Sequence, residues 1–253
     1  MPKRSREQTR ELMLRAATEL VCEGICDTSD ASVSAVLAYV QLTEVAARAT
    51  AIVRAEIQAD SLDHEIAAIT TGAIYQVWPN QGDFQADLLF HIAELDAAFG
   101  PVIDEVAGIV RDGVASGAPL PDVFAALLER SFRHTRDSEV FYASLGFYSR
   151  SGNARVRAAF GHGDEEFTAA IRPVWQALLD GYGLRLRAPY TVDDLAISIA
   201  VTIEGAALQW KRKPEWTRDP LGDERWSLPT RLAQMLFEQM TEPDGERRGG
   251  PEA

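Results

Sequence analysis

The feature that most constrains this chain is a set of apolar side chains that recur every three or four residues. Ser5 and Gln8 form a capping pair of the kind that begins a helix, and Leu12, Ala16 and Leu20 follow on one face. This period is that of an α-helix, whereas a half-buried strand alternates every second residue. Because the same pattern runs along the chain without βαβ alternation, the sequence predicts an all-α fold.

Later helices are predicted by the same reasoning. Starts are expected at Asn80, Pro121, Ser138, Thr191 and Ser227, and after Gly163. Gly100 and Pro101 are expected to end the helix that Asn80 begins. Residues 197–203 also alternate like a strand, but the capping pair Thr191 and Asp194 favours a helix there, because no partner strand is apparent elsewhere.

Composition excludes several classes of protein. The net charge of −13 argues against broad, non-specific nucleic-acid binding. A local basic element remains compatible with it, because the first 15 residues hold five Lys/Arg against two Glu, a balance of +3. No stretch approaches the roughly 18 apolar residues of a membrane span. The charged start is no secretory signal, so we expect a cytoplasmic protein with no membrane association.

The chemistry-bearing residues point away from an enzyme. Cys22 and Cys26 share a helix face, and we expect two buried thiols in a reducing compartment, although a redox pair or half a metal site fits the spacing. The four histidines have no metal-ligand spacing. The sequence assembles no catalytic pair and no cofactor motif, so no enzyme activity, metal or cofactor is expected.

The segment Ile69–Leu89, ITTGAIYQVWPNQGDFQADLL, is the most informative. Its start predicts a short helix over residues 72–78, capped by Thr70 or Thr71 and ended by Pro79. Ile74 and Trp78, four residues apart, are expected to face a core, while Tyr75 and Gln76 face outward. Two interpretations fit: a connector wedged between longer helices, or an element whose small first residues allow close approach to a DNA groove.

The same segment resembles the recognition helix of the TetR family of bacterial transcriptional regulators. Upstream, TRELMLRAATELVCEG (residues 9–24) and LTEVAARA (residues 42–49) resemble the family's first and second helices. The resemblance implies a helix-turn-helix DNA-binding domain over residues 1–96, a ligand-binding and dimerisation domain over 97–242, and a flexible tail over 243–253. It implies a homodimeric repressor that a small-molecule effector releases from a palindromic operator in double-stranded DNA.

The resemblance also implies site residues. Tyr75 and Thr43 would contact phosphate, Arg6 and Arg10 would reach the backbone or minor groove, and a further set would lie in or near the major groove: Thr70, Thr71, Gly72, Ala73 and Gln76. A pocket in the second domain is implied as well. Its candidate lining is aromatic with a few polar anchors: Phe132, Phe141, Tyr142, Phe147, Tyr148, Trp175, Arg172, Gln176 and Glu204.

Three departures from the family pattern and an acidic balance keep an alternative open. Residues 26–41 lengthen the link after the first helix. Residues 50–68 separate the second and third helices, where the family has a tight turn, so they either lengthen the second helix or form a loop. Gln81 stands at a position where the family often has a Lys. Residues 1–90 also hold 7 Lys/Arg and 13 Asp/Glu, a net balance of −6. The alternative is therefore a helical ligand-binding or interaction protein with weakened or lost operator recognition.

Overall fold

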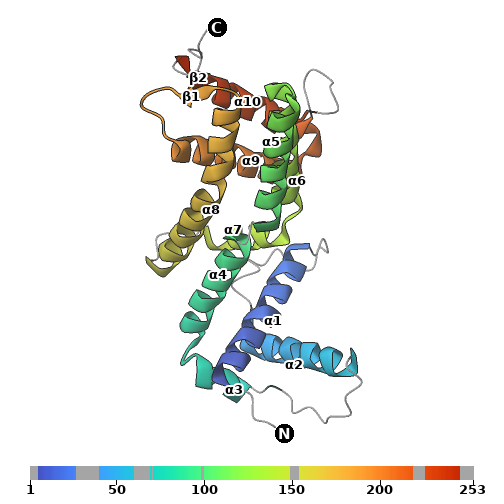
Figure 1. The fold of residues 1–253 in the computed structure, drawn as a ribbon. Helices are drawn as coiled ribbons and strands as arrows, with labels where there is room; N and C mark the ends of the chain where they lie inside the picture. Colours follow the sequence, from blue (N-terminus) through green and yellow to red (C-terminus); the bar gives the residue numbers. More distant parts are fainter. Residues whose placement is uncertain are drawn as a thin grey trace. The chain divides into compact units, whose positions relative to one another are not determined.

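The computed structural model describes residues 5–26, 40–59, 69, 71–97, 100–148, 154–218 and 226–245. The predicted all-α fold is confirmed, with only two short strands among these residues (Figure 1). Packing divides the chain into two compact units. The first comprises Met1–Ala97 and Glu139–Gly163, and the second comprises Ala98–Ser138 and Asp164–Ala253. The described residues between 139 and 163, which were predicted to belong to the ligand-binding half, thus pack with the N-terminal helices.

The first unit is built around one central helix. It contains α1 (Arg6–Cys26), α2 (Leu42–Ala59), α3 (Thr71–Val77), α4 (Gln81–Ala97), α7 (Glu139–Tyr148) and the beginning of α8 (Ala154–Gly181). α1 packs against α2, α3, α4 and α7. The centre of the unit consists of fully buried apolar side chains: Met13, Ile74, Phe84, Leu88 and Ile92.

Two of the predicted helix starts are satisfied by reciprocal hydrogen bonds in this unit. The Ser5 amide donates to Gln8 Oε1 at 2.9 Å, and the Gln8 amide donates to Ser5 Oγ at 3.0 Å. The Asp83 amide donates to Asn80 Oδ1 at 3.0 Å, while the Asn80 side chain donates to Asp83 at 2.8 Å. Each pair satisfies a backbone amide, that of Gln8 or Asp83, which the first helical turn leaves without an intrahelical acceptor.

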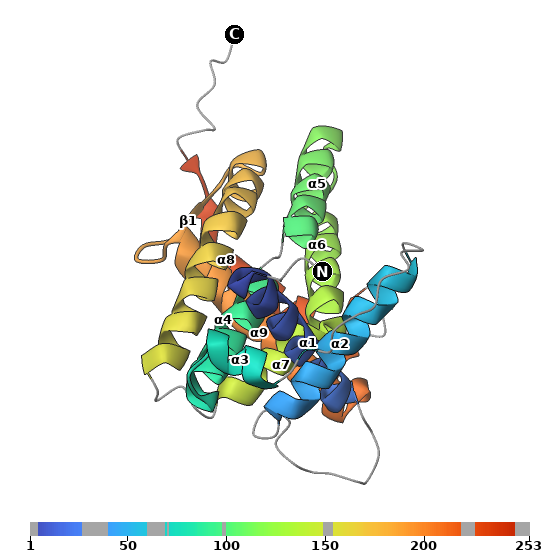
Figure 2. The same cartoon turned by 90° about the horizontal axis from the view of Figure 1, so that it is seen from below.

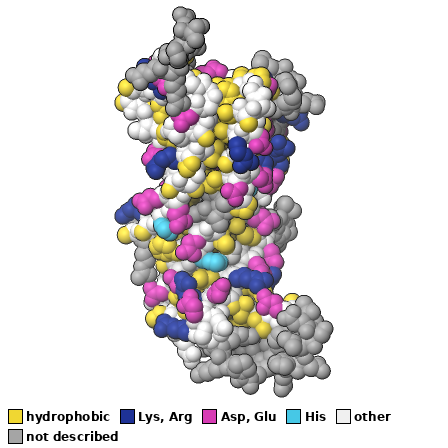
Figure 3. Space-filling view, viewed as in Figure 1, with side chains coloured by type: hydrophobic (Ala, Val, Ile, Leu, Met, Phe, Trp, Pro, Cys, Tyr) yellow, Lys and Arg dark blue, Asp and Glu magenta, His cyan; other side chains and the backbone are white. Residues whose placement is uncertain are grey.

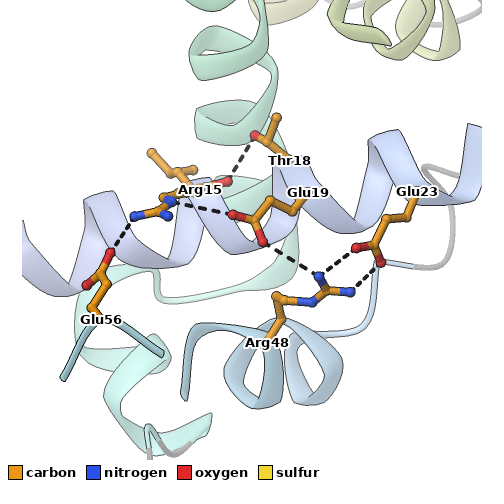
Figure 4. A network of polar contacts seen from close by, with 7 residues as sticks. Arg15, Thr18, Glu19, Glu23, Arg48 and Glu56 are labelled. Atoms are coloured by element: carbon orange, nitrogen blue, oxygen red, sulfur yellow. Dashed lines mark hydrogen bonds and ion pairs between the residues drawn. The ribbon is translucent and has the colours of Figure 1, made fainter. Parts of the chain in front are cut away.

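The residues between the second and third predicted helices are partly helical. α2 continues to Ala59, so residues 50–59 lengthen this helix, and residues 60–68 lie outside the described residues. Ion pairs hold α2 against α1 (Figure 4): Arg15 contacts Glu56 at 2.7 Å, and Arg48 contacts Glu23 and Glu19. The extension of α2 is therefore anchored to α1 by Glu56.

The second unit is a helical bundle with a small sheet. It contains α5 (Gly100–Ser116), α6 (Leu120–Asp137), the rest of α8, β1 (Leu184–Leu186), α9 (Val192–Arg212), η1 (Pro214–Thr217), α10 (Leu228–Met240) and β2 (Thr241–Pro243). α6 packs against α5, α9 and α10. Three buried rings form its aromatic centre, since Phe124 lies 4.8 Å from Phe237 and 6.2 Å from Trp175 between ring centroids.

Two predictions for the second unit are confirmed. Residues 197–203 are helical, and the Thr191–Asp194 capping box is present, with the Asp194 amide donating to Thr191 Oγ1 at 3.1 Å. α10 begins as predicted, with Ser227 as its N-cap and a proline in its first turn. A proline in the first turn also opens α6.

Two features of the second unit were not predicted. Gly100 and Pro101 were predicted to end the helix that Asn80 begins, and in the structure they form the first turn of α5. Proline fits the first turn of a helix because its missing N–H has no intrahelical acceptor there. Strand β1 pairs antiparallel with β2, with Leu184 opposite Pro243. Three-residue strands are too short to show alternation, so this pairing leaves little signal in sequence. Of the predicted tail, Pro243 is the last residue of β2, and the Asp244 amide donates to the Gly183 carbonyl at 2.8 Å. Residues 246–253 lie outside the described residues.

No helix in the described part of the chain is both long and apolar enough to cross a membrane. Within the same ranges, no group of three or more His, Cys, Asp or Glu side chains is arranged to hold a metal ion.

Candidate nucleic-acid interface

α3 buries one face and exposes the other. Ile74 is fully buried, Trp78 directly after the helix is 4% exposed, and its ring meets that of Phe84 edge-on at 5.1 Å between centroids. Tyr75 is 57% exposed, and Gly72 and Gln76 are also exposed. These placements match the predicted inward and outward residues. Among the described side chains, the outward face of α3 is therefore small and polar with one aromatic ring.

A carboxylate on α4 fixes the end of α3. Asp87 Oδ2 accepts hydrogen bonds from the Trp78 indole nitrogen at 2.8 Å and from Arg10 Nε at 3.0 Å. A buried indole N–H needs such an acceptor, because leaving it unsatisfied is costly. Arg6 adds a third contact by donating to the Val77 carbonyl at 3.0 Å. Figures 1 and 2 both show α3 beside the first turns of α1.

These contacts concern two of the candidate DNA-binding residues, Arg6 and Arg10. The resemblance implied that Arg6 and Arg10 reach DNA, whereas the structure engages both with residues of their own unit. Sequence reasoning missed Asp87. The only signal was an acidic residue nine positions after a tryptophan, which does not by itself indicate a contact.

A hydrogen bond joins the start of α4 to the residues that directly precede α2. The Gln81 side chain, on the first residue of α4, donates to the Val40 carbonyl at 3.2 Å. Buried Thr50 accepts a hydrogen bond from the Ile69 amide at 2.9 Å, which fixes the chain shortly before α3. Thr43 is exposed in the first turn of α2. Thr70 and the side chain of Thr71 lie outside the described residues.

Several charged side chains of the first unit form ion pairs. The Arg48 guanidinium hydrogen-bonds Glu23 and holds the pKa of that carboxyl below its usual value. Arg15 joins Glu19 at 3.4 Å and Glu56 at 2.7 Å. Among the described side chains on the face seen in Figure 3, acidic and basic side chains of this unit are interleaved and form no continuous basic patch. α3 itself contains no charged residue. The acid excess therefore does not lie on α3, and several of its members are paired between α1 and α2.

Comparison with known proteins identifies the fold. No family model matches the chain, and no curated protein matches it at a significant level. The solved structure of reduced Escherichia coli NemR matches with 13% sequence identity over 92% of this chain and 98% of that one, with a TM-score of 0.51. A structure described as the molecular basis for control of antibiotic production by bacterial hormones matches with 18% identity, over 94% of this chain and all of the other, with a TM-score of 0.51. The chain has the TetR fold.

A further match is a putative TetR-family transcription regulator from Shewanella sp. PV-4. It has 13% identity over 94% of this chain and all of that one, with a TM-score of 0.48.

The candidate ligand-binding residues are divided between the two units of this TetR fold. Phe141, Tyr142 and Tyr148 belong to the first unit, and the Phe147 side chain lies outside the described residues. The others belong to the second unit: Phe132, Arg172, Trp175, Gln176 and Glu204. All nine were predicted to lie in one domain, over residues 97–242.

Several of the candidate ligand-binding side chains pack or hydrogen-bond with other residues of the second unit. Arg172 makes a two-pronged contact with Asp193, at 2.8 and 2.9 Å, and Gln176 donates to Asp180 at 3.1 Å. Trp175 is 3% exposed and belongs to the aromatic centre of the second unit. Phe132 is buried in α6, and Glu204 is half-buried in α9.

The last two long helices of the TetR fold here carry exposed apolar side chains. α9 and α10 pack against each other. Along α9 the exposed positions are four and seven residues apart, and along α10 they lie within about one turn. They are Ile197, Val201, Leu208, Leu232, Met235 and Leu236, with exposed fractions between 37% and 63%. Both helices thus present an apolar strip away from the core of their own unit.

Proposed function

We propose that this chain is a DNA-binding transcription regulator. The observation that carries the proposal is α3, a short helix that buries Ile74 while it presents Gly72, Tyr75 and Gln76 to solvent, within the TetR fold. A connector helix wedged between longer ones would not leave Tyr75 more than half exposed. A helix with small residues on its outer face fits closely into the major groove.

The proposed roles follow from the family resemblance, and the exposure of the described side chains is compatible with them. Tyr75 and Thr43 contact phosphates, while Gly72, Ala73 and Gln76 lie in the groove. Thr70 and Thr71 are assigned to the groove from the resemblance alone. Arg6 and Arg10 contribute by holding α3, because either side chain must give up its contact with Val77 or Asp87 to reach a phosphate. The phosphate contacts position the protein and carry no sequence information themselves.

The proposed active form is a homodimer assembled through α9 and α10. Exposed apolar side chains on two helices that pack together indicate an interaction surface, and burial against the same helices of a second copy would remove these side chains from water. A two-fold axis duplicates α3, and two such helices on one side of a duplex lie roughly 34–36 Å apart. The operator is therefore proposed to be palindromic.

Release from the operator is proposed to follow effector binding in the helical bundle of the second unit, beside Phe132 and Glu204. The effector can shift the equilibrium between the DNA-bound and released conformations only by the difference between its affinities for the two. A repressor of this type must lose operator affinity when the effector saturates it.

Direct binding tests the proposal. The purified chain should shift a duplex taken from the promoter region of its own gene. Tyr75→Phe, which removes one hydroxyl, should weaken binding about tenfold on any bound duplex. Tyr190→Phe is the matched control, because Tyr190 is similarly exposed, at 47%, but belongs to the second unit. Failure to bind any duplex at low salt would overturn the proposal.

A second candidate function is an interaction or ligand-binding protein that has lost operator recognition. It is favoured by the internal engagement of Arg6 and Arg10, which leaves few described cations near α3 for phosphate. Sedimentation and DNA binding separate the two candidates. A dimer that binds no duplex would support this second function.

A further inference from the structure

The outer face of α3 offers one described side chain that can read the edge of a base pair with two hydrogen bonds. α3 contains no Lys, Arg, Asp or Glu. Gly72 has no side chain, and Tyr75 offers a single hydroxyl at the end of a rigid ring. Gln76 is exposed one residue further on and carries an amide with both a donor and an acceptor.

The chemistry of this amide selects among the bases. In the major groove adenine presents the N6 amino donor beside the N7 acceptor, which matches the carboxamide in a two-pronged contact. Guanine presents two acceptors, N7 and O6, so the amide oxygen would face an acceptor and stay unpaired. Cytosine offers only the N4 donor, so one hydrogen bond forms at most. Adenine is therefore the best partner.

Ala73 adds an apolar contact that also favours an A·T base pair. It lies three residues before Gln76, which places the two side chains next to each other on the helix, and it is partly exposed. Its methyl group is suited to the C5 methyl of thymine. The absence of an arginine or lysine from α3 leaves guanine without its usual partner on this helix.

We infer that Gln76 is a specificity-determining residue and that it recognises an adenine in each operator half-site, with Ala73 against a neighbouring thymine methyl. This inference rests on the proposed function. It names the base class that α3 reads, which sequence resemblance to a family does not supply.

Selection from a duplex pool tests the inference. The full-length protein is incubated with duplexes whose central segment is randomised, and bound molecules are sequenced. The wild-type protein should enrich two symmetric sites with adenine at one fixed position of each half. Gln76→Ala should lose preference at that position alone, and Gln76→Arg should change the preferred base to guanine.

Affinity measurements make the effect quantitative. Replacing the adenine should weaken wild-type binding about tenfold per half-site and leave Gln76→Ala nearly unaffected. Gln81→Ala is the control: Gln81 begins the neighbouring helix and donates to Val40, so its loss should leave the base preference unchanged. Far-UV circular dichroism verifies that the variants fold.

The outcomes separate two failures. Enrichment of a site whose base preferences are the same for wild type and Gln76→Ala would overturn the inference and leave the proposed function standing. Enrichment of guanine at the position that responds to Gln76 would also overturn it. If no duplex is enriched, both the inference and the proposed function fail.

Discussion

Asp87 is the residue on which we expect the position of α3 to depend. Its Oδ2 atom accepts from the Trp78 indole at 2.8 Å and from Arg10 at 3.0 Å. Trp78 is 4% exposed, so Asp87→Ala leaves a buried donor without an acceptor, which costs about 1–3 kcal/mol. The ion pair adds little, about 0–1 kcal/mol, because the Arg10 and Asp87 side chains are 36% and 35% exposed. The expected total loss in the free energy of unfolding is about 2 kcal/mol.

A double-mutant cycle tests this reasoning. Trp78→Phe removes the indole donor and keeps an aromatic ring against Phe84. In that background Asp87→Ala should cost less than about 1 kcal/mol, since only the ion pair is lost. Urea unfolding followed by far-UV circular dichroism gives each free energy. Arg10→Ala alone should also cost less than about 1 kcal/mol. If the two substitutions are additive, Asp87 does not act through the Trp78 indole and the account is refuted.

Three further predictions concern packing, pH and assembly. Gly113→Ala should destabilise the chain by about 1–3 kcal/mol in thermal or urea unfolding, because its Cβ would overlap the Val123 side chain. Gly108→Ala, on the same helix, is the control and should stabilise by about 0.5–1 kcal/mol, because the nearest atom to its Cβ lies 3.6 Å away. Burial lowers the pKa of His91 below its usual value of 6.5, so the unfolded chain binds a proton more readily than the folded chain does. The free energy of unfolding should therefore fall as the pH drops below 6.5. His91→Gln should weaken this pH dependence in urea unfolding. Val201→Glu, at a position 63% exposed, should turn the proposed dimer into monomers in sedimentation experiments, and a dimer that persists would contradict the proposed interface.

The sequence alone determined the local features of this protein. Helix starts at Ser5, Asn80, Thr191 and Ser227 were predictable because a capping side chain acts on a backbone amide two or three residues away. The inner and outer faces of α3 were predictable as well, because burial of Ile74 fixes through the helical period which neighbours point outward. Each of these features could be predicted from residues that lie within a few positions of one another.

The tertiary structure decided which distant residues meet. The Arg10–Asp87 contact joins residues 77 positions apart, and β1 pairs with a strand more than 50 residues later. Sequence reasoning left residues 50–68 open between helix and loop, and the extension of α2 to Ala59 is accompanied by a contact with Arg15. α7 joins the N-terminal unit through packing against α1 and α4. In each case the physical reason is the same, because an ion pair or an apolar face has many possible partners along the chain and only the assembled core selects one.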